Sequence, residues 1–567
     1  MELTQEQKDI LKAFKKHNHI KINAYAGTGK TTTLIEIAKD NPNLNFLVLV
    51  FNKSVKLELE TKMPSNCTVM TIHSLAYKFL DTKFKRKGVL TKKDFTTELS
   101  KYFHSTDYFK TTFLRDVLEK FCNSYYLEAK PENIRQLINL DKDLRNKYKL
   151  LYNANYDSRN IADLASKINT SLLAVSNFEI GLTHDIYLKF FQKLLPAKFI
   201  QDYLKSFDAL LVDESQDLNG IQEYLLVNAP IKKKVAVGDK HQSIYSWRGA
   251  ENTLAKLDWQ EFYLTMSFRF KHEGVVELAN QFLNNWKGET RNLSSQYTGR
   301  ENNLTAHITR TNAQIIELID KAKANEKIRF TREISEIFRS VKEIVKLIEA
   351  INYNDPSGLS GYLKLIYDKM IKENIKETEQ MSEFFLQAGD YEYFNALEIV
   401  KKYGEYKIDD LYKKAIKLKD PNGEKVFTTA HSAKGMEFDN VVIEKDFANI
   451  KDIMAGYIAY EILDKKSKIS EEQAESLLQG IKNHDSVLSD VIDEINLQYV
   501  ATTRAIKNIS GAGLKNIVDG FREVFKAKEL AKIVNKRRED IDKSLGINTE
   551  PEQKKPQIKK QNKVANF

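Results

Sequence analysis

The chain has 567 residues, which is too long for one hydrophobic core, so we expect three or four compact units. Its 42% apolar and 10% aromatic residues exclude global disorder, and its net charge of +10 fits a polyanionic partner such as a nucleic acid. The two cysteines form no CxxC pair, which argues against a zinc or iron–sulfur site. The start "MELTQEQKDI" lacks an apolar signal region, and no apolar run is long enough to span a bilayer. We therefore expect a soluble, cytoplasmic protein without a membrane partner.

Short apolar runs predict buried β-strands in two regions of the chain. The first region holds "FLVLV" (46–50), "ALLV" (209–212) and "VAVG" (235–238), and the second holds "VFTTA" and "NVVIE" within residues 426–444. Strands that are apolar along their whole length suit parallel sheets covered by helices on both faces. The sequence therefore predicts an α/β fold.

Helical segments are expected between these strands. Residues 81–195 and 325–418 are rich in Lys, Glu, Leu, Ile and Tyr and have few strand signals. A third helical insert, at about 449–490, includes "SEEQAESLLQGIKN", where Ser470 is placed to cap a helix and Gln473 to close a capping box. The last 22 residues, from Gly546, predict a disordered basic tail.

The stretch "AYAGTGKTTTL", which starts at Ala24, predicts a phosphate-binding loop. Gly27 and Gly29 let successive backbone N–H groups face one anion at the head of a helix that starts near Lys30. Lys30 would reach the β and γ phosphates, and the Thr31 hydroxyl would ligate Mg²⁺. The other nucleotide contacts expected from the loop are Ala26, Thr28 and Thr32.

The stretch "LLVDESQD" supplies the acidic groups that such a loop requires. Asp213 follows a predicted strand and can hold the metal, while Glu214 is the natural general base for the attacking water. The two stretches together predict an NTPase that uses ATP and Mg²⁺.

The motifs from Gln7 to Arg504, in their order, resemble those of the UvrD/Rep-like superfamily 1 DNA helicases. Within that group, "AYAGTGKTTTL", "VFNKS" and "GLTHDIYLKFFQ" are most similar to the core of the F-box DNA helicases. No F-box segment precedes the core, so we do not expect the ubiquitin-ligase role of those proteins. The resemblance implies two RecA-like parallel-sheet P-loop NTPase lobes with mainly helical insertions, and ATP bound between the lobes.

The resemblance also implies further nucleotide contacts. Gln7 in "LTQEQ" would read the adenine edge, since an amide offers both a donor and an acceptor. Gln242 in "VGDKHQSIYSWRGA" would sense the γ-phosphate, and the arginines Arg269 and Arg504 would neutralise charge as that phosphate leaves. The remaining implied nucleotide contacts are Phe268 on the adenine, Gly435 near the γ-phosphate and Glu437 on the ribose.

A second set of residues is implied to contact the nucleic acid. Tyr245 and Trp247 would stack on unpaired bases, with Arg248 beside them, and such stacking tolerates any sequence. His431 and Lys434 in "TTAHSAKGMEFDNVVI" would couple the nucleotide to the strand. The other implied strand contacts are Phe51, Asn52, Lys53, Thr71, His73 and Arg310.

The chain departs from the family pattern in three places. Thr32 stands where relatives often have Arg, and "FNKS" is one residue shorter than the "FTNKA" of many relatives. The insertion in the second lobe, about 90 residues, is smaller than in the larger relatives, which leaves the strength of duplex unwinding open.

The expected division of the chain follows from these placements. The units are a first ATP-binding lobe at 1–80 plus 196–280, its helical insertion at 81–195, a second lobe at 281–324 plus 419–525, its insertion at 325–418, and a basic C-terminal helix with the tail at 526–567.

The function that the resemblance implies is an ATP-dependent 3′–5′ DNA helicase and single-stranded DNA translocase of repair, recombination or replication. Its partners would be single-stranded DNA and single/double-strand junctions. A translocase that strips proteins from single strands, the motor subunit of a nuclease or defence complex, and an RNA substrate stay open as alternatives. Lys30, Asp213, Glu214 and the two arginines argue against a non-catalytic scaffold.

Overall fold

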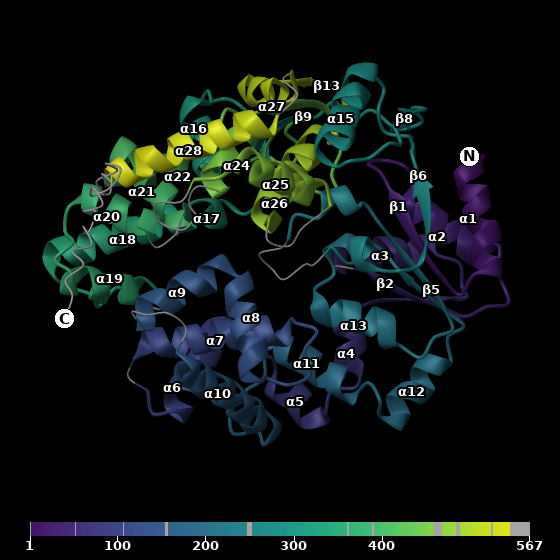
Figure 1. The fold of residues 1–567 in the computed structure, drawn as a ribbon, viewed down its shortest axis with the longest axis horizontal. Helices are drawn as coiled ribbons and strands as arrows, with labels where there is room; N and C mark the ends of the chain where they lie inside the picture. Colours follow the sequence, from purple (N-terminus) through teal and green to yellow (C-terminus); the bar gives the residue numbers. More distant parts are fainter. Residues whose placement is uncertain are drawn as a thin grey trace, which may run out of the picture.

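The computed structural model describes residues 2–50, 53–105, 107–152, 157–245, 252–359, 362–387, 391–458, 468–483, 488–522 and 526–544. The structure contains two large parallel β-sheets, the first with its strands at the right of Figure 1 and the second with its strands near the top, together with two helical regions. The expected α/β class, with parallel sheets and mainly helical insertions, is confirmed. Within the described residues, no helix combines the length and the apolar character that crossing a membrane requires.

The first sheet has six parallel strands in the order β3-β2-β4-β5-β1-β6. Its strands are β1 (His19–Ala24), β2 (Phe46–Val50), β3 (Cys67–Thr71), β4 (Ala209–Val212), β5 (Lys233–Gly238) and β6 (Gln260–Leu264). Side chains of β2 alternate between two cores: Phe46 and Val48 enter one, whereas Leu47 and Leu49 enter the other. Both faces of this sheet are therefore covered, as the wholly apolar "FLVLV" run predicts.

The second sheet has five parallel strands in the order β10-β11-β9-β12-β13. Its strands are β9 (Thr305–Thr309), β10 (Ile328–Phe330), β11 (Lys425–Thr429), β12 (Phe438–Ile443) and β13 (Ala505–Ser510). A short parallel pair, β7 (Met266–Ser267) and β8 (Ser294–Ser295), lies in the segment that leads from the first sheet to the second.

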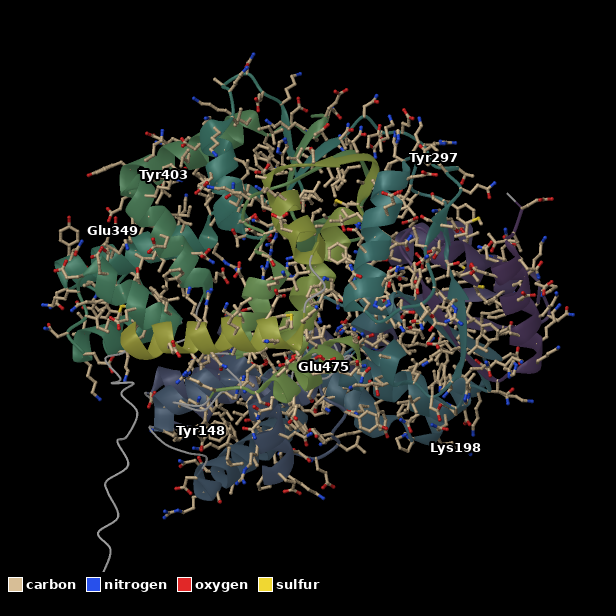
Figure 2. The ribbon with its side chains drawn as sticks, turned by 45° about the horizontal axis from the view of Figure 1, so that its top comes forward. Tyr148, Lys198, Tyr297, Glu349, Tyr403 and Glu475 are labelled. Atoms are coloured by element: carbon tan, nitrogen blue, oxygen red, sulfur yellow. The ribbon has the colours of Figure 1, made fainter. Side chains whose placement is uncertain are left out.

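Helices pack on both sheets and form the two helical regions. The first region, between β3 and β4, holds α4 (Ile72–Lys78), α5 (Thr82–Lys87), α6 (Lys92–Tyr102), α7 (Tyr108–Cys122), α8 (Pro131–Leu140), α9 (Lys142–Tyr152), α10 (Ser158–Ser176), α11 (His184–Leu194) and α12 (Lys198–Lys205). The second, between β10 and β11, holds α17 (Ile334–Ile337), α18 (Arg339–Tyr353), α19 (Tyr362–Lys372), α20 (Thr378–Gln387), α21 (Tyr391–Tyr403) and α22 (Glu405–Leu418). Figure 2 marks the first region by Tyr148 and the second by Glu349 and Tyr403.

The remaining helices lie before, between and after the strands of the two sheets. They are α1 (Gln5–Lys16), α2 (Lys30–Lys39), α3 (Lys53–Lys62), α13 (Gly220–Asn228), α14 (Thr253–Lys256), α15 (Glu273–Trp286), α16 (Asn312–Lys321), α23 (Ala430–Ala433), α24 (Ile450–Tyr457), α25 (Glu471–Lys482), α26 (Ser489–Thr502), α27 (Ala512–Arg522) and α28 (Ala527–Ser544), with the 3₁₀ turns η1 (Ser215–Asp217) and η2 (Lys240–Gln242). Helix α15 packs its apolar face into the core of the second sheet.

Several predicted elements are confirmed in detail. Helix α2 begins at Lys30, and α25 begins after Ser470, whose side chain forms the expected capping box with Gln473. The predicted tail, residues 546–567, lies outside the described residues. The residue bounds of the expected units stay a prediction.

Candidate nucleotide site between the two sheets

The phosphate loop joins the end of β1 to the start of α2. Gly27 and Gly29 have φ values of 75° and 80°, a left-handed conformation that glycine adopts without strain. A Cβ atom on Gly27 would lie 2.5 Å from Ser267 Oγ and 2.7 Å from Arg269 Cβ, and the Phe268 N–H donates to the Gly27 carbonyl at 2.8 Å. The loop therefore needs glycine both for its turn and for its contact with the segment after β6.

The head of α2 carries the two side chains expected to meet phosphate and metal. Lys30 Nζ lies 3.0 Å from Glu214 Oε1, and Thr31 Oγ1 lies 3.4 Å from Asp213 Oδ2. Burial lowers the pKa of Lys30, but the carboxylates of Glu214, Asp213 and Asp239 outweigh burial, so the net shift is upward. Lys30 therefore stays charged at the head of α2. Around it, Ala26 and Thr28 are buried, and Thr32 is exposed.

The two adjacent acids have opposite electrostatic environments. Burial and the neighbouring Glu214 charge raise the pKa of Asp213. Burial also opposes ionisation of Glu214, but Lys30 and Lys434 outweigh it and lower the pKa of Glu214. Glu214 also has a left-handed backbone, with φ 51°, which for a non-glycine residue marks a conformation held by its surroundings. Glu214 is therefore held ionised, as a general base must be.

Gln216, which the sequence reasoning missed, fixes the position of Glu214. Its Nε2 donates to Glu214 Oε2 at 2.5 Å, and its Oε1 accepts the Asp239 N–H at 3.1 Å. The side chain is fully buried, and a Cβ on Gly238 would lie 2.0 Å from its Oε1. The only sequence signal was its place within "DESQD", because its partner Asp239 is 23 positions away, just after strand β5.

The turn η2 presents Gln242 to groups from the second sheet. Gln242 Nε2 donates to Asp239 Oδ2 at 2.7 Å, and its Oε1 accepts from Arg504 Nη2 at 3.1 Å. Lys434 Nζ donates to the Gln242 carbonyl at 2.6 Å and pairs with Asp217 Oδ2 at 2.5 Å. Gln242 is thus contacted by an arginine and a lysine that both come from the second sheet's side.

The two predicted arginines lie close to each other and to the loop. Arg504 is 1% exposed and forms no ion pair with a carboxylate among the described residues. Burial, with Arg269 as the next cause, lowers the pKa of Arg504 to about 9. Arg269 donates to Glu437 Oε1 at 2.8 Å and to the Thr503 carbonyl at 2.8 Å. A buried guanidinium without a counter-ion is suited to an anionic ligand.

The residues expected at the base and the ribose surround the same loop. A Cβ on Gly29 would lie 3.3 Å from Gln7 Nε2 and 3.6 Å from the Phe268 ring. The Gln7 amide donates to Thr33 Oγ1 at 3.2 Å and closes the capping box of α1, so adenine would have to share or replace these bonds. Gly435 has φ 82° and no atom within 4 Å of a Cβ built on it, so its outer face is open.

The predicted strand contacts fall into separate places. Tyr245 lies with its ring centroid 6.3 Å from that of His431 and 5.1 Å from Lys434 Nζ, which links it to the nucleotide site. His73 Nδ1 lies 3.1 Å from the Tyr187 hydroxyl, and Thr71 caps α4. Lys53 is exposed at the start of α3. Phe51, Asn52, Trp247 and Arg248 lie outside the described residues.

Arg310 is engaged by a carboxylate. Its Nε lies 2.8 and 2.9 Å from the two oxygens of Glu494, and its Nη2 contacts the same carboxylate. Burial opposes its charge, but Glu494 outweighs burial and raises the pKa of Arg310. A strand phosphate would therefore have to compete with Glu494.

A buried cluster around Glu289 ties the loop and the η2 turn together, and sequence reasoning missed it. Glu289 accepts from Tyr25 Oη at 3.1 Å, from Lys240 Nζ at 2.5 Å and from His241 Nε2 at 3.0 Å. Tyr25 opens the phosphate loop, and the other two donors precede Gln242. No local motif marks Glu289, which stands in the polar segment after α15.

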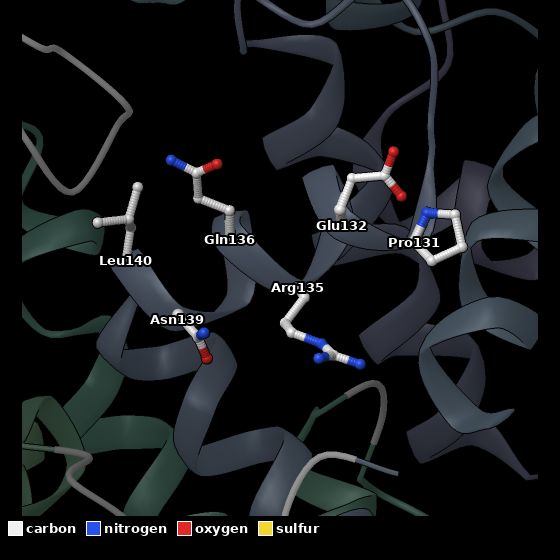
Figure 3. A pocket seen from close by; sticks show the side chains of 6 residues that line it. All are labelled: Pro131, Glu132, Arg135, Gln136, Asn139 and Leu140. Carbon is white, nitrogen blue, oxygen red and sulfur yellow. The ribbon is translucent and has the colours of Figure 1, made fainter. Parts of the chain in front are cut away.

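A separate hollow lies away from this cleft. Figure 3 shows it along one helix, α8, with a volume of about 410 Å³ and side chains of Pro131, Glu132, Arg135, Gln136, Asn139 and Leu140 around it. It contains none of the predicted site residues.

Comparisons with known proteins agree with the motif assignment. Residues 3–262 match the UvrD/REP helicase N-terminal domain. The chain is 27% identical to F-box DNA helicase 1 of Gallus gallus, covering 89% of this chain and 48% of that protein. It is 25% identical to F-box DNA helicase protein 1 of Schizosaccharomyces pombe, covering 89% and 57%. A probable DNA helicase II homolog of Mycoplasma genitalium is 25% identical, covering 58% and 50%.

The chain thus spans about half the length of these relatives. The matched domain contains the phosphate loop, the acid pair and the η2 turn. Residues 3–262 therefore resemble the UvrD/REP helicase N-terminal domain, and the predicted resemblance of the chain to the UvrD/Rep-like helicases, with the F-box DNA helicases among its relatives, is confirmed.

Proposed function

We propose that the chain is an ATP-dependent DNA helicase and single-stranded DNA translocase that moves 3′ to 5′ inside the cell, in DNA repair, recombination or replication. One observation carries the proposal: Lys30, Glu214 and Gln242 from the first sheet face Arg504 and Lys434 from the second. A nucleotide bound there would join the two sheets, so its hydrolysis can move one against the other.

The chemistry follows from the contacts of Glu214. In the proposed reaction, water attacks the γ-phosphorus, its proton passes to Glu214, and the bond to the β-phosphate oxygen of ADP breaks. Lys30 now pairs with Glu214 at 3.0 Å, so arriving phosphates would draw Lys30 away and leave the carboxylate to accept a water. Arg504 and Arg269 would neutralise the charge that develops on the departing phosphate.

The residues present fit a magnesium ion. A hydroxyl and a carboxylate, Thr31 and Asp213, stand 3.4 Å apart at the head of α2, and oxygen ligands of this kind suit a hard cation that also binds phosphate. These two residues would hold the ion, which would shield the phosphate charge during attack.

Coupling to a strand would run through Lys434. Its Nζ contacts Asp217 and the Gln242 carbonyl and also lies over the Tyr245 ring, the predicted base-stacking platform. A change at the γ-phosphate would therefore reach the strand through one side chain. Closing and opening of the cleft would alternate two grips on single-stranded DNA, and the polarity is proposed from the family resemblance.

The first test is the ATP hydrolysis rate without nucleic acid, with single-stranded DNA and with single-stranded RNA. We expect strong stimulation by DNA and a loss of roughly 100-fold or more in Glu214→Gln, because the general base is removed. Glu326→Gln is the matched control, since Glu326 also pairs with a lysine at 2.9 Å but lies outside the cleft. A rate that ignores DNA overturns the assigned substrate.

The second test separates unwinding from stripping and reads the polarity. Duplexes with a 3′ or a 5′ single-stranded tail are mixed with ATP, and release of the labelled strand is followed. Release from the 3′-tailed junction alone supports the proposal. DNA-stimulated hydrolysis without release from either substrate favours the translocase that strips proteins from single strands.

A further inference from the structure

Helices α4 and α5 carry positive charge that no carboxylate of a described residue neutralises. Between residues 72 and 88 the sequence has five basic residues and one acidic residue. Among the ion pairs of the described residues, none involves the basic side chains of this segment, which are Lys78, Lys83, Lys85, Arg86 and Lys87. A surface with an excess of positive charge attracts a polyanion.

Aromatic rings stand among these cations. Tyr77 is 38% exposed, and Lys85 Nζ lies 5.5 Å from its ring centroid. Phe199 at the start of α12 is 55% exposed and lies 5.9 Å from Phe79, ring to ring. We call the set Tyr77, Lys78, Lys85, Arg86, Lys87 and Phe199 the basic–aromatic surface. Exposed rings beside cations are the combination that binds unpaired bases together with their phosphates.

The packing beneath the surface holds it in place. The Lys85 ammonium donates to the Lys78 carbonyl at 3.1 Å, which joins α5 to the end of α4. Phe84 is buried and packs against Phe178 with ring centroids 4.3 Å apart. Lys78 Nζ lies 4.1 Å over the Tyr203 ring of α12. The rings and charges are therefore presented by a packed scaffold.

The surface continues from a predicted strand contact. His73 and Tyr77 are four residues apart on α4, so they lie on the same side of the helix. Both contact Tyr187: its hydroxyl lies 3.1 Å from His73 Nδ1, and its ring centroid lies 6.0 Å from that of Tyr77. A strand that reaches His73 would therefore find the exposed Tyr77 ring on the same side of α4.

We propose that the basic–aromatic surface binds single-stranded nucleic acid beyond His73, as an extension of the strand track of the motor. This inference rests on the proposed function, because that function supplies the single strand that the surface would bind. The rings distinguish it from a duplex contact, because the bases of a duplex are stacked on each other and are not open to Tyr77 and Phe199.

The test compares oligothymidylates of roughly 8 and roughly 20 nucleotides, a short one that fills the track and a longer one that reaches the surface. Affinity is measured by fluorescence anisotropy without ATP, on the full chain. Lys78→Gln/Arg86→Gln removes two exposed charges, and Tyr77→Ala removes a ring. Lys321→Gln/Lys323→Gln and Tyr406→Ala are matched controls, since these side chains are also exposed and lie at the end of α16, just after it, and on α22 of the second helical region. Figure 1 shows α16, which ends at Lys321, on the opposite side of the molecule from α5.

We expect the wild-type chain to bind the long oligonucleotide more tightly than the short one. The double lysine–arginine variant should lose that advantage and show a salt slope smaller by about 1.4, at about 0.7 per lost phosphate contact. Tyr77→Ala should weaken long-oligonucleotide binding about fivefold or more. Both variants should match the wild type on the short oligonucleotide.

The inference is overturned if the variants lose affinity equally for both lengths, lose affinity only for a blunt duplex, or lose no affinity. If the wild-type chain binds both oligonucleotides and the surface variants bind them with the same affinities, the proposed function stands without the extension. If the wild-type chain binds neither, the proposed function fails as well. Circular dichroism melting curves confirm that each variant is folded.

Discussion

At the scale of single residues, Lys434 contacts several functional groups that its place in the sequence motif does not reveal. It contacts Asp217 and the Gln242 carbonyl, and its charge helps to lower the pKa of Glu214. Asp217 remains hard to ionise even so, because burial outweighs Lys434 and raises its pKa to about 6. The charge of Lys434 therefore matters to two buried carboxylates at once.

Replacing Lys434 should change the pH dependence of hydrolysis. The base Glu214 works only when ionised, so activity falls as pH drops through its pKa. Lys434→Met removes one of the cations that lower that pKa, so the acid limb of the kcat/KM profile should move to higher pH by roughly one unit. Lys425→Met is the control, since Lys425 pairs with Glu326 outside the cleft. An acid limb that stays in place contradicts the assignment of Glu214 as the base.

Glu289 should contribute stability that depends on pH. Burial opposes its ionisation, but His241 and Lys240 outweigh burial and hold the pKa of Glu289 far below its usual range. A carboxylate with a lowered folded-state pKa stabilises above its unfolded pKa, about 4.3, and that stability is lost as pH falls toward the folded value.

Glu289→Gln should therefore lower the free energy of unfolding at pH 7 by about 2 kcal/mol or more, since Lys240 loses its buried partner. The difference from the wild type should shrink as urea titrations are repeated below pH 4. Glu301→Gln is the control: Glu301 also contacts two lysines but is exposed, so water screens it and the change should be much smaller. A penalty independent of pH would falsify the electrostatic account.

At the residue scale, some of the candidate site residues could be predicted from the sequence and others could not. Lys30, Asp213 and Glu214 stand in short motifs whose residue types and order are enough to identify them. Glu289 has no such motif, and its three donors lie about 50 and 260 residues away. The pairing of Arg310 with Glu494 joins residues 184 positions apart, so sequence could name the arginine but not its partner.

At the scale of elements, loops at the carboxyl ends of strands shape the cleft. Two glycines with positive φ offer a comparison. Gly435 follows α23 and stands between Lys434 and Glu437, whereas Gly404 precedes α22 in the second helical region. Both have positive φ, 82° and 72°, and neither would have an atom within 4 Å of an added Cβ.

Alanine at either glycine should cost about 1–3 kcal/mol, the strain of an L-residue held at positive φ. Only Gly435→Ala should also lower ATP hydrolysis, because strain there shifts Lys434 and Glu437. The measurements are urea unfolding and the DNA-stimulated rate of each variant. If the two alanine variants lose equal stability and keep equal ATP hydrolysis rates, the loop of Gly435 has no role at the nucleotide.

The apolar character of each strand explains which strands could be predicted from the sequence. The runs that became β2, β4 and β11 are apolar enough to stand out, and β5 begins two residues before the predicted run. Strand β13, "AIKNIS", alternates half-buried and exposed positions toward its end because it lies at the edge of its sheet. Edge strands have a weaker apolar signal, and sequence reasoning did not identify this one.

At the scale of the whole molecule, the turn 239–243 of the first sheet is held by side chains from the second. Arg504 contacts Gln242, Lys434 contacts its carbonyl, and Asn496 Nδ2 donates to the Ser243 carbonyl at 2.6 Å. Lys287 in turn contacts the Asn496 side chain. A nucleotide that pulls on Gln242 would therefore act directly on α26 and on the segment after η2 that carries Tyr245.

This arrangement predicts reciprocal coupling between nucleotide and strand. A non-hydrolysable ATP analogue should change the affinity for single-stranded DNA by roughly 5- to 150-fold, and DNA should change the affinity for the analogue by the same factor. Lys434→Met should bring both factors toward one, because Lys434 touches Gln242, Asp217 and the Tyr245 ring together. Lys425→Met should leave both unchanged. Anisotropy gives the dissociation constant for DNA with and without the analogue, and calorimetry gives that for the analogue with and without DNA. The two ratios must agree, which checks the measurement. A variant that binds both ligands and keeps the wild-type factor shows that coupling passes instead through Arg504 and Asn496.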